Sequence, residues 1–165
     1  MREKKKIAVV PGSFDPITNG HLSVIKKAAD DYDTVFVAVM INSEKRYMFD
    51  LEQRKNIAKA ALEGIDNVEV ISSDGWLWEL AKSLEACAIV KGYRNDIDLE
   101  YERKMAIFNE EKYPQAKTVL IKSEDNLSDL SSTVVRDKIL SGASLEGLVP
   151  TKAICEIQRI RSNQK

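Results

Sequence analysis

Short runs of β-branched and other apolar residues alternate with amphipathic stretches along this chain, and this alternation constrains the fold more than any other feature. The apolar runs predict strands, and the stretches with helical periodicity predict helices. The expected strands are Ile7–Val10, Val35–Ile41, Val68–Ile71, Ala88–Val90 and Thr118–Ile121. The expected helices are His21–Ala29, Leu51–Leu62, Leu77–Leu84, Leu99–Lys112, Ser132–Leu140 and Lys152–Arg161.

The expected strands are nearly all apolar, which is typical of parallel strands covered on both faces. Five strand–helix units in series predict an α/β fold: a doubly wound, Rossmann-like five-stranded parallel sheet with helices on both faces. Asp50, with Gln53 three residues later, predicts a helix start, while Gly64 and Gly142 predict helix ends. We expect one domain over residues 1–165, with the segment from about 145 to 165 packed on it.

Charge and cysteine content exclude several classes of function. Lysine and arginine total 25 against 26 acidic residues, so no net field attracts nucleic acid or an anionic membrane. The apolar run Ile7–Val10 is too short for a signal peptide or a membrane span. Cys87 and Cys155 match no metal spacing, and we expect two reduced, partly buried thiols in a protein of the cytoplasm.

Glycines, hydroxyls and cations follow the expected strands. In open α/β sheets, ligands bind beyond the carboxyl ends of the strands. The segments at that edge are Pro11–His21, Asn42–Arg46, Ser72–Leu77, Lys91–Arg94 and Ser123–Thr133. Helix N-termini and backbone amides bind anions, and cations neutralise them. The sequence therefore predicts a phosphate-binding site at this edge.

Each of these residues also has a plain structural interpretation. Gly12 could serve only a tight turn, Ser132 only a helix N-cap, and Lys45 only as a solvated loop charge. His21 is the sole histidine, so no histidine-based metal cluster is available. Their occurrence after successive strands favours the shared site over these separate interpretations.

Three common nucleotide and hydrolase motifs are missing from the sequence. There is no G-x-x-x-x-G-K-[ST] loop, no G-x-G-x-x-G after the first strand and no G-x-S-x-G elbow. These absences argue against a P-loop enzyme, a dinucleotide-dependent dehydrogenase and an α/β-hydrolase.

Four segments resemble motifs of the nucleotidyltransferases that carry an [ST]-x-x-H or H-x-G-H loop. The segment 12–21, GSFDPITNGH, resembles the signature loop in the form typical of the bacterial phosphopantetheine adenylyltransferase family. Residues 131–136, SSTVVR, resemble the family's late I-S-S-[ST] motif. Residues 91–94 with 98–102 resemble R-G-[LI]-R…D-[FY]-E-Y-E, and residues 45–49 resemble K-x-x-[ML]-F. The similarity covers nearly the whole chain in the same order.

The resemblance implies transfer of an adenylyl group from ATP to 4′-phosphopantetheine, giving dephospho-coenzyme A and pyrophosphate. It implies catalytic roles for His21 and Lys45. It implies that the acceptor is bound by Ser13, Lys45, Leu77 and Lys91. It implies that ATP is bound by Ser13, Phe14, His21, Gly92, Tyr93, Arg94, Glu102, Leu127, Ser128, Asp129, Leu130, Ser131, Ser132 and Thr133.

The chain departs from the family pattern at three positions. Lys91 stands where the family usually has arginine, and lysine cannot form a planar bidentate clamp on phosphate. Leu127 stands in place of a frequent tryptophan, and Tyr47 in place of a common proline. Ser13 and His21 follow the pattern.

The resemblance also implies partners and a mechanism without a general base. A phosphate monoester has a second pKa of about 6 and is already a nucleophile at neutral pH. We expect Mg²⁺ with the triphosphate and no metal site made by the protein. The resemblance further implies a homohexamer and coenzyme A as a feedback ligand.

Two alternatives remain open at this point. One is a same-fold nucleotidyltransferase with another acceptor or nucleotide, such as a cytidylyltransferase or a nicotinate mononucleotide adenylyltransferase. Those relatives usually carry H-x-G-H, whereas position 19 here is asparagine. The other is a non-catalytic nucleotide sensor, against which the presence of Ser13, His21 and Lys45 argues.

Overall fold

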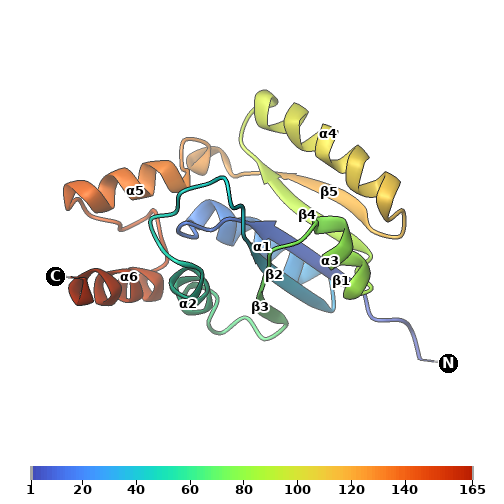
Figure 1. Cartoon of the computed structure of the whole chain (residues 1–165), viewed down its shortest axis with the longest axis horizontal. Helices are drawn as coiled ribbons and strands as arrows, with labels where there is room; N and C mark the ends of the chain where they lie inside the picture. The colour runs from blue at the N-terminus through green and yellow to red at the C-terminus, as the bar shows by residue number, and fades with distance from the viewer. Residues whose placement is uncertain (1, 165) are drawn as a thin grey trace.

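The computed structural model describes residues 2–164 and shows one parallel five-stranded sheet between two layers of helices (Figure 1). The strands are β1 (Ile7–Gly12), β2 (Thr34–Met40), β3 (Val68–Ser73), β4 (Ala88–Tyr93) and β5 (Lys117–Lys122). The helices are α1 (Asn19–Asp31), α2 (Leu51–Ala61), α3 (Leu77–Ser83), α4 (Asp96–Lys112), α5 (Ser132–Ser141) and α6 (Thr151–Asn163), with a 3₁₀ turn η1 (Asp125–Leu127). Met1 and Lys165 lie outside the described residues.

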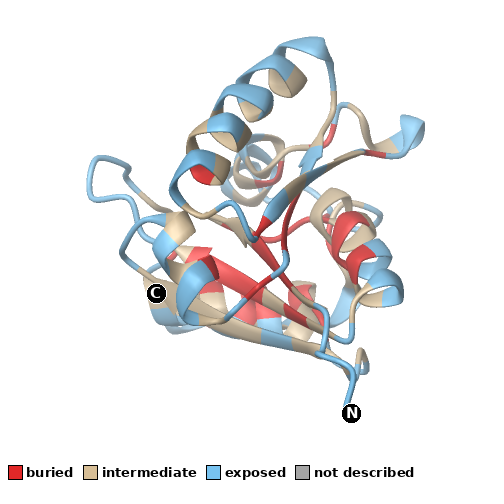
Figure 2. Ribbon diagram, turned by 90° about the vertical axis from the view of Figure 1, so that its right-hand side faces the viewer, coloured by how far each residue is buried: buried red, intermediate tan, exposed pale blue. Residues whose placement is uncertain are grey.

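The strand order β3-β2-β1-β4-β5 confirms the predicted doubly wound, Rossmann-like α/β fold. Successive side chains of a strand point to opposite faces. Ala8 and Val10 accordingly pack in one buried cluster, with α1, α2, α5 and α6, while Val9 packs in the other, with α3. Buried residues concentrate in the central strands, as Figure 2 shows.

The C-terminal helix α6 packs beside α2, and Ala153, Ile157 and Ile160 bury their side chains in the larger cluster (Figure 1). Lys152 adds an exposed ion pair with Glu63, 3.2 Å from nitrogen to oxygen. The segment thus shares its core with the sheet.

Two helix ends follow the sequence signals, and one does not. Asp50 and Gln53 form a reciprocal capping box at the start of α2, and Gly142 ends α5 in the left-handed conformation with φ 74°. Helix α2 ends earlier than predicted, with Leu62 as its C-cap, and Gly64 takes φ 92° in the following turn. The glycine therefore serves the turn and not the helix end.

Strand ends and cysteines differ from the prediction. Four strands continue past their apolar runs, because the backbone ladder persists where side chains become polar; Lys91, Gly92 and Tyr93 thus belong to β4 and not to the loop after it. The thiols of Cys87 and Cys155 were expected to be partly buried, and that prediction is wrong, since both are exposed. Their positions in apolar stretches did not reveal that each faces outward.

Candidate active site

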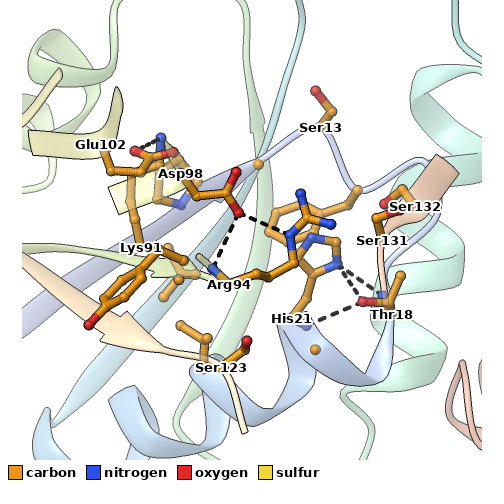
Figure 3. Close-up of a pocket in the computed structure, with 18 of the residues that line it drawn as sticks. Ser13, Thr18, His21, Lys91, Arg94, Asp98, Glu102, Ser123, Ser131 and Ser132 are labelled. Carbon is orange, nitrogen blue, oxygen red and sulfur yellow. Dashed lines mark hydrogen bonds and ion pairs between the residues drawn. The ribbon is translucent and has the colours of Figure 1, made fainter. Parts of the chain in front are cut away.

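A cleft of about 600 Å³ lies at the carboxyl ends of β1 and β4, where the chain turns to opposite sides of the sheet (Figure 3). That position is the topological switch point, at which open α/β sheets bind ligands, and the volume suits a small molecule. Most of the predicted site residues line the cleft: Ser13, Phe14, His21, Lys45, Leu77, Lys91, Gly92, Tyr93, Arg94, Glu102, Leu127, Leu130, Ser131 and Ser132. The structure therefore brings together segments that follow every strand.

His21 is held as a neutral hydrogen-bond donor. Thr18 is the N-cap of α1, and its backbone N–H donates to His21 Nδ1 over 3.0 Å, which leaves the ring proton on Nε2. Burial, and then the charge of Arg94, lowers the pKa of His21 from 6.5 to about 4. At neutral pH the cleft therefore contains an uncharged imidazole that can donate from Nε2.

Ser13 and Lys45 meet at the cleft although they follow different strands. Lys45 Nζ lies 3.5 Å from Ser13 Oγ. The buried carboxylate of Asp15 accepts hydrogen bonds from the backbone N–H groups of Met48 and Phe49, over 2.9 and 3.0 Å. Asp15 thereby fastens the Lys45 segment to the loop after β1, and the pair offers a hydroxyl and an ammonium to one anion.

Two cations, Lys91 in β4 and Arg94 just after it, each meet an acidic residue of α4 (Figure 3). Lys91 Nζ lies 2.7 Å from Glu102 Oε2, although the ammonium does not approach along a hydrogen-bonding direction. Arg94 Nε donates to Asp98 Oδ2 over 3.0 Å. Since residues i and i+4 share a helix face, Asp98 and Glu102 form a row of carboxylates along this wall. Lys91, predicted to bind the acceptor, thus has a counter-ion within the protein.

The start of α5 supplies backbone amides and not free hydroxyls. The N-cap of α5 is Ser131 and not Ser132, the residue for which the sequence suggested that role. The Ser131 Oγ accepts a hydrogen bond from the Val134 N–H. Ser132 Oγ donates to the Pro16 carbonyl over 2.9 Å, and Thr133 Oγ1 accepts from Arg136 over 3.0 Å. First-turn N–H groups of a helix have no intrahelical partners, so they are the groups here that suit a phosphate.

Not all predicted residues reach the cleft with their side chains. Ser128, Asp129 and Thr133 are not among the residues that line it. Phe14 lines the cleft but is buried, with φ 50° in the left-handed region and its ring edge-on to His21 at 5.0 Å between centroids. The buried Phe14 ring therefore packs against the imidazole of His21 and fixes its orientation.

Several residues of the site were missed by sequence reasoning. Thr18, Asp98 and Tyr101 line the cleft, and Asp15 and Arg54 hold its loops. Thr18 had a local signal, since a threonine three residues before a side-chain acceptor is a capping-box pattern, and Asp98 lies four residues after Arg94, its ion-pair partner. Asp15, Asp98 and Tyr101 lie inside two of the segments that carry the family resemblance, but the motifs alone gave them no role. Asp15 and Arg54 act through partners remote in sequence.

Residues 9–138 match the model of the cytidylyltransferase-like family. A protein of Clostridium botulinum (strain Alaska E43 / Type E3) named phosphopantetheine adenylyltransferase is 41% identical over 93% of this chain and 97% of its own length. One of the same name from Streptococcus uberis is 38% identical over 96% of this chain and 97% of its own length.

A solved structure shares the fold. The crystal structure of a putative nicotinate-nucleotide adenylyltransferase from Vibrio parahaemolyticus superposes with a TM-score of 0.69 over 94% of this chain and 93% of that one, at 19% sequence identity. Among residues 2–164, no helix has the length and hydropathy that crossing a membrane requires.

Proposed function

The chain belongs to the cytidylyltransferase-like family and, within it, to the phosphopantetheine adenylyltransferases, and from this we propose that it transfers an adenylyl group reversibly from ATP to 4′-phosphopantetheine. The products are dephospho-coenzyme A and pyrophosphate, as in coenzyme A biosynthesis. The observation that carries the proposal is the neutral His21 donor in the same cleft as the Ser13–Lys45 pair. Several relatives that match nearly the full chain carry the name phosphopantetheine adenylyltransferase, and this does not favour the two alternatives, a different acceptor or a non-catalytic sensor.

The acceptor would bind between Ser13, Lys45, Leu77 and Lys91, which all line the cleft. Lys45 and the Ser13 hydroxyl would hold the phosphate, while Leu77, at the start of α3, offers an apolar contact for the pantetheine arm. Lys91 would have to share its charge between Glu102 and the acceptor phosphate.

ATP would occupy the other half of the cleft. The end of β4 (Gly92 and Tyr93), Arg94 just after it, and Glu102 would line the adenine and ribose pocket. Phe14 would contribute its backbone while its ring stays buried. Ser13 and the segment Leu127–Thr133, which leads into α5, would receive the triphosphate through backbone amides and the helix N-terminus. His21 would lie at the α-phosphate.

The proposed reaction is a direct in-line displacement. A dianionic phosphate oxygen of the acceptor attacks the α-phosphorus of ATP, a new P–O bond forms, and the bond to the bridging oxygen breaks to release pyrophosphate. No proton must be removed from the nucleophile, so no base is required. His21 Nε2–H stabilises charge developing on a non-bridging oxygen, and Lys45 reduces repulsion between the reactants.

We propose that Mg²⁺ enters with ATP. Residues 2–164 include no group of three or more histidine, cysteine or acidic residues placed to hold a metal ion. The cleft carboxylates Asp98 and Glu102 face Arg94 and Lys91. Mg²⁺ would be held by phosphate oxygens of the nucleotide, as it commonly is, and would offset phosphate charge in the cleft.

We further propose a single catalytic domain of the cytoplasm that assembles as a homohexamer and binds coenzyme A as a feedback ligand. Support for assembly comes from α4, where Ile97 and Ile107 are large, apolar and exposed outside the cleft. Apolar side chains gathered on one helix are typical of a subunit contact.

Pyrophosphate release by the purified protein tests the proposal. With ATP, Mg²⁺ and 4′-phosphopantetheine, we expect rapid release, and we expect little with CTP or with nicotinate mononucleotide as the alternative substrates. His21→Ala should lower kcat roughly 10²–10³-fold, as loss of one transition-state donor does. Turnover only with an alternative pair would reassign the acceptor, and near-normal kcat in His21→Ala would remove His21 from the chemistry.

A further inference from the structure

Arg54, on α2, is a buried cation directly behind the loop after β1. The residue is 2% exposed, and its Nη1 donates to the carbonyl of Ser13 over 2.9 Å and to that of Met40 over 3.1 Å. It thus ties the Ser13 loop to the end of β2. No acidic side chain within residues 2–164 forms an ion pair with it. Since burying an unpaired charge is costly, its place calls for a function.

Tyr47 covers this guanidinium from the loop that carries Lys45. Its ring centroid lies 3.8 Å from Arg54 Cζ, a close cation–π contact. Its hydroxyl accepts from the Asn42 N–H over 2.9 Å, which joins the two ends of the segment 42–47. The loop is therefore held against Arg54 on one side and, through Asp15, against the β1 loop on the other.

These contacts form a closed ring that includes Ser13 and Lys45, the two proposed ligands of the acceptor phosphate. Arg54 holds the Ser13 backbone, the Ser13 hydroxyl meets Lys45, and the Lys45 loop returns to Arg54 through Tyr47. We infer that Arg54 and Tyr47 are positioning residues for the acceptor phosphate. They hold Ser13 and Lys45 within hydrogen-bonding distance of each other, and Arg54 places a positive charge on the far side of the Ser13 loop from the phosphate. The inference rests on the proposed function.

The expected signature is a change in the Michaelis constant for one substrate. The ring supplies both proposed ligands of the acceptor phosphate, Ser13 and Lys45, whereas ATP would be held mainly by His21, β4 and the start of α5, with Ser13 as its one contact to the ring. We expect Arg54→Met, which keeps an apolar stem but removes the charge and both hydrogen bonds, to raise the acceptor KM at least tenfold. The KM for ATP should change less than threefold. Arg54→Lys should recover part of the loss, because it keeps the charge but has one nitrogen for two carbonyls.

Matched variants separate positioning from folding. Lys59→Met removes a charge from an exposed position of the same helix and should leave both KM values unchanged. Tyr47 is only partly buried, so Tyr47→Leu should fold even where Arg54→Met does not. We expect Tyr47→Leu to raise the acceptor KM several-fold, and Tyr47→Phe, which keeps the ring, to stay near the wild type.

Steady-state kinetics with each substrate varied in turn, with a circular-dichroism melt of every variant, decide the matter. Acceptor KM rising alone in Arg54→Met and Tyr47→Leu supports the inference. Lower melting temperatures with both KM values unchanged, or equal rises for both substrates, would overturn it and leave the proposed function intact. If Arg54→Met does not fold, the Tyr47 pair decides by the same criterion. A wild type inactive with phosphopantetheine would overturn both.

Discussion

The chemistry of the cleft depends on which nitrogen of His21 carries the proton. The Thr18 N–H occupies Nδ1, and burial opposes a second proton, so the donor at Nε2 is present over the whole neutral range. A charged imidazolium would attract phosphate more strongly, but it would attract ground state and transition state alike. A neutral donor placed at the α-phosphate gains most as charge develops there.

The lowered pKa of His21 predicts a loss of stability in acid. The unfolded chain takes up the proton near pH 6.5 and the folded chain only near pH 4, so stability falls as the pH drops through that window. A shift of that size corresponds to about 3 kcal/mol. Urea unfolding at pH 7 and pH 4 should show this loss in the wild type relative to His21→Gln, which keeps a capping-box side chain at the same position. Equal losses in both proteins would contradict it.

At Lys91, replacement by arginine should preserve or strengthen the binding of the acceptor. Its single ammonium faces Glu102, whereas a guanidinium can hold a carboxylate on one edge and a phosphate on another. We therefore expect Lys91→Arg to keep or lower the KM for phosphopantetheine, measured by pyrophosphate release. A large rise would mean that this position serves a different ligand.

At the scale of elements, α1 and β4, which carry opposite sides of the cleft, lie in close contact at Val24 and Gly92. A Cβ built on Gly92 would fall 2.8 Å from Val24 Cγ2, so only glycine allows this approach without movement. Helix α1 carries His21, and β4 carries Lys91 and Tyr93. Their spacing therefore sets the distance between His21 and the opposite wall of the cleft.

Replacing Gly92 tests that contact. We expect Gly92→Ala to cost about 1–3 kcal/mol, as overpacking of a tight core contact does. Val24→Ala removes the methyl group in the way, so the double variant should lose at least about 1 kcal/mol less than the sum of the single losses. Urea denaturation of the four proteins measures this coupling. Strictly additive losses would show that the two elements can move apart freely.

At the scale of the whole molecule, helix α4 has two different sides. One side sets Asp98 and Glu102 against the cations of the cleft, and α4 also packs on β4 and β5. Elsewhere on the helix, Ile97 is 82% exposed and Ile107 60% exposed. If the apolar surface of α4 is the proposed subunit contact, the same helix would form part of both the cleft wall and the contact with a neighbouring subunit.

Charged substitutions on α4 test the proposed hexamer. Ile97→Glu together with Ile107→Glu should lower the mass measured by light scattering after size-exclusion chromatography, because the introduced carboxylates would lose hydration in a subunit contact. Leu140→Glu on α5 is the control, since this residue is similarly exposed at 67% but lies outside α4. A hexamer that survives the α4 changes would place the contact on another surface.

The sequence by itself determined the order of the elements and the edge of the sheet at which we propose that phosphate binds. Apolar periodicity and capping signals are local, and the carboxyl ends of parallel strands must meet at one edge, so Ser13, His21 and Lys45 could be grouped without coordinates. The family resemblance narrowed the choice of acceptor to 4′-phosphopantetheine.

Only the tertiary structure decided how charges and polar groups pair. Arg54 reaches Ser13 across 41 positions and Arg136 reaches Asp15 across 121 positions of sequence. Lys91 meets Glu102 because α4 packs on β4, and Ser132 reaches Pro16 because α5 returns to the loop after β1. Such pairings depend on the distances between packed elements, and no local pattern records those distances.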